Sequence, residues 1–297
     1  MTWLPPLDET LRDAYLRRLG LAGVPAPSVE TLFAVHRAQA ERIPYETVWL
    51  WLGEPRTVAP LDCVRYLVAG RGGYCYHLNG ALATLLGWLG FDVHRHVGGV
   101  QGSAADPPGA TANHLALTVR GLPTDDNPGG AWFVDTGLGD GLHEPMPLVA
   151  GGSRQGPFQY GLSASTAVEG GWRFHADLRM SLVGMDFAAE DAPPGAFDEK
   201  HAWFQTSPDS GYLRVLAMVR RDATGVDLLR GRILRRVGEP GAPRELTTSA
   251  DWFTALADVF GLPLSDVDDG RREALWARMS AAHDAWLAGQ AQEAAAQ

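Results

Sequence analysis

The sequence predicts an α+β fold, in which helices occupy the first third of the chain and strands dominate the middle. Up to Gly90, apolar residues recur at intervals of three and four, the period of a helix with one buried face. After Gly90 they form short alternating or β-rich runs, separated by Gly and Pro clusters at 106–109, 125–130 and 151–153, as in an antiparallel sheet or small barrel. We therefore expect three domains: residues 1–90, mainly helical; 91–195, mainly strands; and 196–297, mixed.

Composition narrows the class of protein. The 297 residues are 45% hydrophobic and 20% charged, which is typical of a soluble globular chain. The net charge of −10 argues against a general affinity for nucleic acid or anionic lipid. No leader-like or membrane-spanning apolar run occurs, so we expect a cytoplasmic protein. Cys63 and Cys75 are the only cysteines, which favours reduced thiols over a disulfide framework or a zinc site.

The helical part is predicted to contain four helices. Leu11, Tyr15 and Leu19 recur at four-residue spacing, and a second helix opens at Ser28 and is broken by the sequence at 43–46. A third helix covers 61–68 after Pro60, and a fourth runs from Leu78 to the glycine at position 90.

The strands that follow are predicted at 93–100, 114–119, 131–134 and 172–183. A linker at 191–195 precedes the final third, where 212–220 and 226–235 form a hairpin that turns at 222–225. Thr248 and Asp251 have the spacing of a capping box for a helix that ends near Phe260. A last helix carries Leu275, Met279, Ala282 and Trp286 on one face.

Cys75 lies where a glycine-rich turn, 71–74, meets the fourth helix. The free N–H groups and the positive dipole end of a helix N-terminus favour an anion, and hence a reactive thiolate. The alternative is a small buried core cysteine, which is the commoner environment of a lone thiol.

A nucleophilic thiol needs a base, and the base needs a group that orients it. His114 opens the apolar strand 114–119, and Asp135 follows the neighbouring strand 131–134, so both could converge on the helix that carries Cys75. His77, two residues after Cys75, points to another helix face and is a poor partner. The alternative is a core thiol with two unrelated polar residues at strand ends.

Other motifs carry weaker signals. His94 and His96 share a strand face, where a polar surface is favoured over a metal pair. The glycine-rich stretch 137–141 is not a dinucleotide loop, because the prolines at 145 and 147 forbid the helix that such a loop must open. For the basic cluster at 230–236, a solvated strand face is favoured over a phosphate contact such as the nucleotide end of coenzyme A. This cluster comprises Arg230, Arg232, Arg235 and Arg236.

The stretch around Cys75 is similar to a known signature. Arg71-Gly72-Gly73-Tyr74-Cys75 followed by Asn79 resembles the Arg-Gly-Gly-x-Cys-x-x-x-Asn pattern of the arylamine N-acetyltransferase family. Further similar stretches follow in the family's order at 42–46, 114–115, 134–139, 206–212 and 229–232, so the resemblance covers roughly residues 10–265.

The resemblance implies a helical bundle carrying the nucleophile, a β-barrel carrying His and Asp, and an α/β lid, around a cysteine-protease-like core. It makes Cys75 the nucleophile, His114 the base and Asp135 the orienting group. No permanently bound cofactor is implied. Acetyl-CoA or another acyl thioester is a co-substrate, and an arylamine or arylhydrazine takes the acyl group from Cys75 in a ping-pong reaction.

Matching positions imply pocket walls at Tyr45, Leu138, Gly139 and Tyr212, although each also has a core-packing explanation. Tyr45 and Leu138 replace the family's usual Phe, so the acceptor is less well supported than acyl transfer. One alternative is an amide synthase that takes a polyketide chain from an acyl carrier protein. Another is a non-catalytic binding protein of the same fold, and a thiol hydrolase is a lesser possibility.

Overall fold

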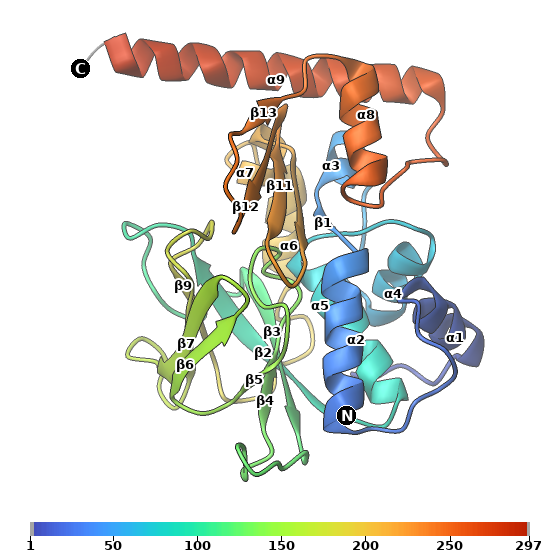
Figure 1. Cartoon of the computed structure of the whole chain (residues 1–297), viewed down its shortest axis with the longest axis vertical. Helices are drawn as coiled ribbons and strands as arrows, with labels where there is room; N and C mark the ends of the chain where they lie inside the picture. Colours follow the sequence, from blue (N-terminus) through green and yellow to red (C-terminus); the bar gives the residue numbers. More distant parts are fainter. Residues whose placement is uncertain (1–2, 296–297) are drawn as a thin grey trace.

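Helices make up the N-terminal part of the chain, as the apolar spacing predicts (Figure 1). The computed structural model describes residues 3–295, with side chains as far as residue 289. The first helices are α1 (Glu9–Arg18), α2 (Val29–Arg42), α3 (Val48–Trp51), α4 (Pro60–Val68) and α5 (Cys75–Trp88). Side-chain caps fix two of the starts: Asp8 accepts the Leu11 N–H at 3.0 Å, and Ser28 accepts the Thr31 N–H at 3.2 Å. The sequence does not predict the short helix α3.

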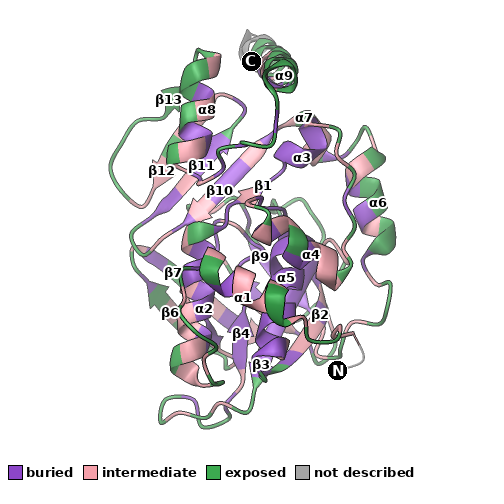
Figure 2. Cartoon of the chain, turned by 90° about the vertical axis from the view of Figure 1, so that its right-hand side faces the viewer, coloured by how far each residue is buried: buried purple, intermediate pink, exposed green. Residues whose placement is uncertain are grey.

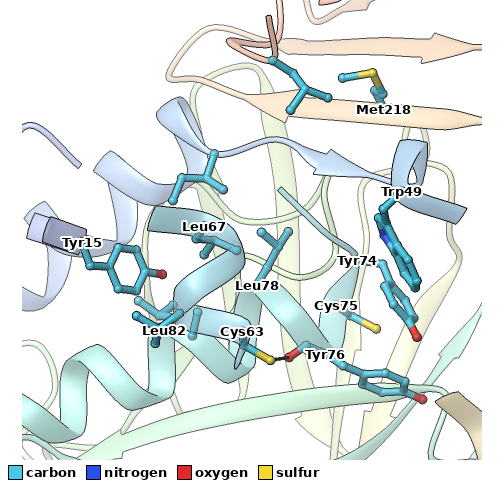
Figure 3. Close-up of a cluster of buried hydrophobic side chains, with 14 of the residues drawn as sticks. Tyr15, Trp49, Cys63, Leu67, Tyr74, Cys75, Tyr76, Leu78, Leu82 and Met218 are labelled. Atoms are coloured by element: carbon cyan, nitrogen blue, oxygen red, sulfur yellow. Dashed lines mark hydrogen bonds between the residues drawn. The ribbon is translucent and has the colours of Figure 1, made fainter. Parts of the chain in front are cut away.

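Helix α5 lies in the middle of the N-terminal core and is buried at nearly every position (Figure 2). Leu82 of this helix belongs to the same hydrophobic cluster as Tyr15 of α1 and Leu67 of α4 (Figure 3). Gly80 permits close packing against α4, because a Cβ at that position would lie only 3.2 Å from Cys63 Sγ. The first residue of α5 is therefore held by a rigid element.

The sequence at 43–46 ends α2, as predicted, but it also forms a strand that the sequence does not predict. This strand, β1 (Tyr45–Glu46), pairs antiparallel with β10 (Ala217–Arg221), with Tyr45 opposite Val219. On its other edge it bridges Gly73, whose carbonyl accepts the Glu46 N–H at 2.9 Å. β1 thus joins the C-terminal sheet to the turn before Cys75.

The middle of the chain forms an antiparallel sheet of eight strands. Their order is β5 (Met146–Pro147), β4 (Trp132–Val134), β3 (His114–Arg120), β2 (Asp92–Gln101), β9 (Gly184–Phe187), β8 (Trp172–His175), β7 (Phe158–Ala164) and β6 (Gly151–Gln155). The sheet forms a near-barrel whose edge strands are β5 and β6. Among the described residues no hydrogen-bonded pairing joins these two strands, so the barrel is not closed. His114 pairs with Gly98 in the last residue pair between β2 and β3, so it lies at the end of strand β3.

Two strand predictions in this region are wrong. Of the predicted strand 172–183, only 172–175 is a strand, β8; the chain then turns at Asp177, and the next strand, β9, begins only at Gly184. The Asp177 carboxylate accepts the Gln159 N–H at 2.9 Å and binds Arg179. The glycine-rich stretch at 151–153, predicted to separate elements, instead begins β6 of the hairpin β6–β7.

The final third contains α6 (Asp198–Thr206), α7 (Gly211–Arg214), β10, β11 (Val226–Arg230), β12 (Ile233–Val237), β13 (Arg244–Glu245), α8 (Ser249–Asp258) and α9 (Asp269–Ala295). The hairpin turn at 222–225 is confirmed, since the Asp222 N–H donates to the Gly225 carbonyl at 3.0 Å. The predicted strand 226–235 is wrong as one strand, because Gly231 at φ +56° reverses the chain between β11 and β12. The predicted strand 212–220 is wrong at its start, where 212–214 belong to α7 and the strand β10 begins only at Ala217. The Thr248 cap is confirmed at 3.1 Å from the Asp251 nitrogen.

Two hydrophobic cores hold these parts together. The larger one contains the helices and one face of the five-stranded sheet β1–β10–β11–β12–β13, and the smaller one fills the near-barrel. Helix α9 lies across the end of the five-stranded sheet (Figure 1). The division into domains at 1–90, 91–195 and 196–297 stays a prediction. Of the helices that the structure describes, none combines the length and the apolarity that a membrane crossing requires.

Candidate active site

Cys75 is the first residue of α5, as the sequence predicts, and Tyr74 precedes it in an extended conformation. Close contacts, rather than left-handed backbone angles, require the two glycines of the preceding turn. A Cβ on Gly72 would lie 2.1 Å from the Pro44 carbonyl oxygen, and one on Gly73 would lie 2.5 Å from His77 Cβ. The turn that presents the thiol is therefore packed directly against β1 and α5.

Charged side chains that are themselves buried hold the same turn. Arg56 donates to the Gly72 carbonyl at 2.9 Å and lies 3.6 Å from the Glu46 carboxylate, which is fully buried. Arg71 binds Asp266 at 2.8 Å and lies 3.5 Å from Glu54. Both members of the Arg56–Glu46 pair are buried, so removing either one would leave an uncompensated buried charge, whereas the Asp266 partner of Arg71 is exposed.

His114 and Asp135 form the pair that the sequence predicts. His114 Nε2 lies 2.7 Å from Asp135 Oδ2, and both side chains are buried. Burial lowers the pKa of His114, but the charge and hydrogen bond of Asp135, together with a hydrogen bond to Cys75, outweigh it and raise that pKa to about 10. Because Asp135 occupies Nε2, the ring nitrogen that remains for the thiol is Nδ1.

The carboxylate of Asp135 is fixed on both oxygens. Oδ1 accepts the N–H groups of Gly137 and Leu138 at 2.8 and 3.0 Å, while Oδ2 is bound to His114. Its own N–H donates to His36 Nε2 at 3.3 Å, and His36 Nδ1 donates in turn to the His143 carbonyl at 3.0 Å. Burial lowers the pKa of His36 to about 4, so the ring is neutral and can accept this bond.

Asn79 links the helix of the thiol to the two strands of the pair. Its Nδ2 donates to the Leu115 carbonyl at 2.7 Å, and its Oδ1 accepts the Thr136 N–H at 3.0 Å. Gln39 supports the same place, because it donates to the Thr136 hydroxyl at 2.7 Å and to the Leu78 carbonyl at 3.0 Å. Sequence reasoning missed the roles of His36 and Gln39; the available signal was two polar residues on the apolar face of α2.

Three of the four residues predicted to form pocket walls, Tyr45, Gly139 and Tyr212, lie close to one another. The hydroxyl groups of Tyr45 and Tyr212 are 2.9 Å apart, and burial, with a smaller contribution from the nearby Cys75 sulfur, raises the pKa of both phenols. Gly139 has φ +73°, and a Cβ on it would lie 3.2 Å from the Tyr45 ring. Leu138 is 9% exposed and belongs to the core of the near-barrel.

Several other candidates lie apart from this site. Cys63 is buried and hydrogen-bonds the Tyr76 carbonyl, and burial raises its pKa to about 12 (Figure 3). His77 is enclosed by aromatic rings such as Trp49, away from the thiol, as predicted. His94 contacts Asp191 and His96 contacts Thr118. Within the described part of the chain, no group of three potential metal ligands converges.

Comparison with known proteins agrees with this architecture. A family model described as N-acetyltransferase matches residues 28–268. An arylamine N-acetyltransferase of Mycolicibacterium smegmatis is 32% identical over 273 residues, which cover 85% of this chain and 92% of that protein. The structure of Mycobacterium marinum arylamine N-acetyltransferase in complex with CoA matches with a TM-score of 0.77 and 25% identity, over 90% of this chain and 97% of that chain.

Fold and sequence therefore define an acyltransferase that acts on nitrogen. More narrowly, the chain belongs to the arylamine N-acetyltransferase family and is an enzyme of that kind. This confirms the family resemblance and the α+β fold, and it makes the non-catalytic alternative wrong. A more distant relative is the proansamycin X synthase of Amycolatopsis mediterranei, which is 31% identical over 46% of this chain and 52% of that protein.

Proposed function

We propose that this enzyme transfers an acetyl group from acetyl-CoA to an arylamine or arylhydrazine through a thioester on Cys75. The observation that carries the proposal is that Cys75 begins α5 beside the start of β3: its Sγ lies 3.6 Å from the Asn113 carbonyl oxygen and interacts with His114 of the buried His114–Asp135 pair. The solved M. marinum relative contains CoA, which supports the donor. The name of the M. smegmatis relative supports an arylamine acceptor.

In the first half-reaction, the Cys75 sulfur attacks the carbonyl carbon of the donor thioester. The new bond is between that sulfur and the acetyl carbon, and the bond to the CoA sulfur breaks. His114 gives its proton to the departing CoA thiolate. The raised pKa of His114 means that an imidazolium is available for this step at neutral pH, next to a helix end that favours the Cys75 anion.

In the second half-reaction, the amine nitrogen attacks the Cys75 thioester. Neutral His114 takes the proton that the amine loses, and the Cys75 thiolate leaves, which restores the starting ion pair. Asp135 keeps the imidazole in one orientation throughout, because its second oxygen is fixed by two backbone N–H groups. We assign the walls that receive the acceptor to Tyr45, Leu138, Gly139 and Tyr212.

The test is intact-mass spectrometry after exposure to acetyl-CoA without an acceptor. We expect a gain of about 42 Da, one acetyl group in place of a proton, on Cys75 and its loss when an arylhydrazine is added. Cys75→Ala should gain no mass and show no transfer. The matched control is Cys63→Ala, which should acetylate as the wild type does, because the Cys63 thiol is buried and its pKa is raised. Acetylation or transfer by Cys75→Ala would contradict the proposal.

A second candidate is amide synthesis from a carrier-bound polyketide chain. The similarity to proansamycin X synthase favours it, as does the replacement of aromatic Phe by Leu138 at the pocket wall. This candidate predicts that Cys75 is labelled by an acyl carrier protein and not by acetyl-CoA. The same mass measurement therefore distinguishes acetyl transfer from amide synthesis.

A further inference from the structure

A cavity of about 220 Å³ lies where the end of α1, the end of α4 and the loop 261–266 meet. Its lining includes Arg18, Arg71, Leu264, Ser265 and Asp266, and none of the three candidate catalytic residues. The volume is below that of ordinary small-molecule pockets, which hold roughly 300–1,000 Å³. The cavity therefore suits an ion or a very small ligand.

Arg18, the last residue of α1, brings a half-buried charge to this cavity without a counter-charge. Its Nε and Nη2 are buried and make no hydrogen bond to any described residue. Burial, and then the nearby charge of Arg42, lower its pKa, and within the described residues no carboxylate lies within 4.0 Å of its guanidinium group. A polar group buried in this way costs free energy unless an acceptor binds it.

Capping of α1 does not explain the position of Arg18. The backbone N–H groups at 19–21 already donate to the carbonyl groups at 15–17, each at 2.9 Å. Arg42 adds a second charge rather than a partner. A Cβ on Gly20 would lie 2.8 Å from Arg42 Cζ, so this guanidinium group lies against the chain just after α1, and it too has no carboxylate of the described chain within 4.0 Å. Two neighbouring cations without counter-charges repel each other, and an anion bound beside them would relieve that repulsion.

Arg71 lines the cavity from the turn that carries Cys75, and one of its nitrogens is also unused. Its Nε and Nη2 bind Asp266 Oδ2 at 3.1 and 2.8 Å, and Nη2 lies 3.5 Å from Glu54 Oε1. Its Nη1 is buried and makes no hydrogen bond to any described residue, and the whole residue is only 5% exposed. Asp266 and Glu54 thus neutralise Arg71, and the charges that lack a partner are those of Arg18 and Arg42.

The nitrogens left without partners favour a tetrahedral oxyanion. Nε and Nη2 form one edge of the Arg18 guanidinium group, and such an edge binds two oxygens of a phosphate or sulfate group through parallel hydrogen bonds. A third oxygen of the same group can accept a hydrogen bond from Arg71 Nη1. A carboxylate has only two oxygens, so it would satisfy Arg18 and leave Arg71 Nη1 without a partner.

We propose that this cavity is an anion site, which binds a phosphate or sulfate group between Arg18 and Arg71. The bound group links the end of α1 to the turn 71–74, which carries Cys75, and offsets the charges of Arg18 and Arg42. It takes no part in the chemistry at Cys75, so the site exists whether or not acetyl transfer is detected.

The test follows thermal unfolding of the wild type, of Arg18→Gln and, as a matched control, of Arg17→Gln, which changes an exposed neighbour in α1 outside the cavity. Sodium phosphate, sulfate, acetate and chloride are compared at one ionic strength. We expect phosphate and sulfate to raise the midpoint of the wild type and of Arg17→Gln by about 2–4 °C once their concentration exceeds Kd roughly tenfold. The midpoint of Arg18→Gln should not respond.

Calorimetry with inorganic phosphate measures binding directly. We expect the affinity to fall at least about tenfold in Arg18→Gln and to be unchanged in Arg17→Gln. A parallel titration with glycerol phosphate distinguishes a phosphate ester from the free ion as the ligand, and arginine-dependent binding of either supports the site.

A folding defect is excluded by the measurements in chloride. There Arg18→Gln should unfold at the temperature of the wild type or above it, because the change removes a half-buried charge that has no partner. Equal phosphate shifts in the wild type and Arg18→Gln, a shift that chloride reproduces, or no phosphate binding by the wild type would each overturn the anion site. If acetate is as effective as phosphate, the assignment to a tetrahedral oxyanion is wrong.

Discussion

At the scale of single residues, two buried histidines in one network have opposite electrostatic properties. His114 faces the carboxylate of Asp135, so its charged form is favoured. His36 faces the Asp135 N–H and the His143 carbonyl, and burial without a facing carboxylate favours its neutral form. The pKa of His114 is raised because its ring faces a carboxylate, and the pKa of His36 is lowered because its ring is buried between backbone groups.

For His114 we expect stability to fall as pH rises. Its pKa is raised from 6.5 to about 10 in the folded protein, so between these values the native state binds the proton that the unfolded state has lost. The free energy of unfolding should therefore decrease by up to about 1.4 kcal/mol per pH unit above pH 6.5. Urea titrations at pH 6.5 to 9 measure this slope, and His114→Gln should flatten it. If the slope is unchanged in His114→Gln, the His114–Asp135 pair does not retain a proton above pH 6.5 in the folded protein.

For His36 the sign is reversed. Its pKa is lowered from 6.5 to about 4, so the unfolded state binds a proton in this window that the native state does not. Stability should fall as pH drops from 6.5 to 4, and His36→Gln, which keeps a donor and an acceptor, should reduce that loss. The same urea titrations at acid pH test this, with His114→Gln as the matched comparison. If His36→Gln loses as much stability between pH 6.5 and 4 as the wild type does, the buried neutral ring of His36 is not the cause of that loss.

At the scale of elements, the turn before Cys75 is determined by contacts with β1. Gly72 lies against the Pro44 carbonyl, and the Glu46 N–H binds the Gly73 carbonyl. Neither glycine has a positive φ, so the requirement for glycine comes from packing. This explains why the turn has no room for a side chain.

Gly72→Ala is expected to destabilise the protein by about 3 kcal/mol, because the added methyl would lie 2.1 Å from a backbone oxygen that cannot rotate away. The matched control is Gly211→Ala at the start of α7, where the new methyl meets no atom within 4 Å, and its effect should stay within about 0.5 kcal/mol. Chemical denaturation measures both variants. Equal stability of the two would contradict this account of the turn.

At the scale of the whole molecule, the sequence predicts the fold class and the three site residues because their signals are local. Cys75 follows a glycine turn, His114 begins an apolar strand, and Asp135 ends another. What the sequence misses depends on distant partners: β1 has only two residues and exists because β10 and Gly73 flank it. The hydrogen bonds of His36 and Gln39 likewise depend on a loop about 100 residues further along the chain. The spacing of apolar residues within a single helix carries no information about such a distant partner.

The position of β1 makes the nucleophile dependent on the last third of the chain. One edge of this two-residue strand is occupied by β10 and the other by the turn that carries the thiol. A protein cut short before residue 217 would leave β1 with a bare edge, so proteolytic loss of the C-terminal sheet should disorder the reactive cysteine even though the cut lies far from it in sequence. Synthesis on the ribosome has the same consequence, because the thiol would acquire its final environment only after β10 has emerged.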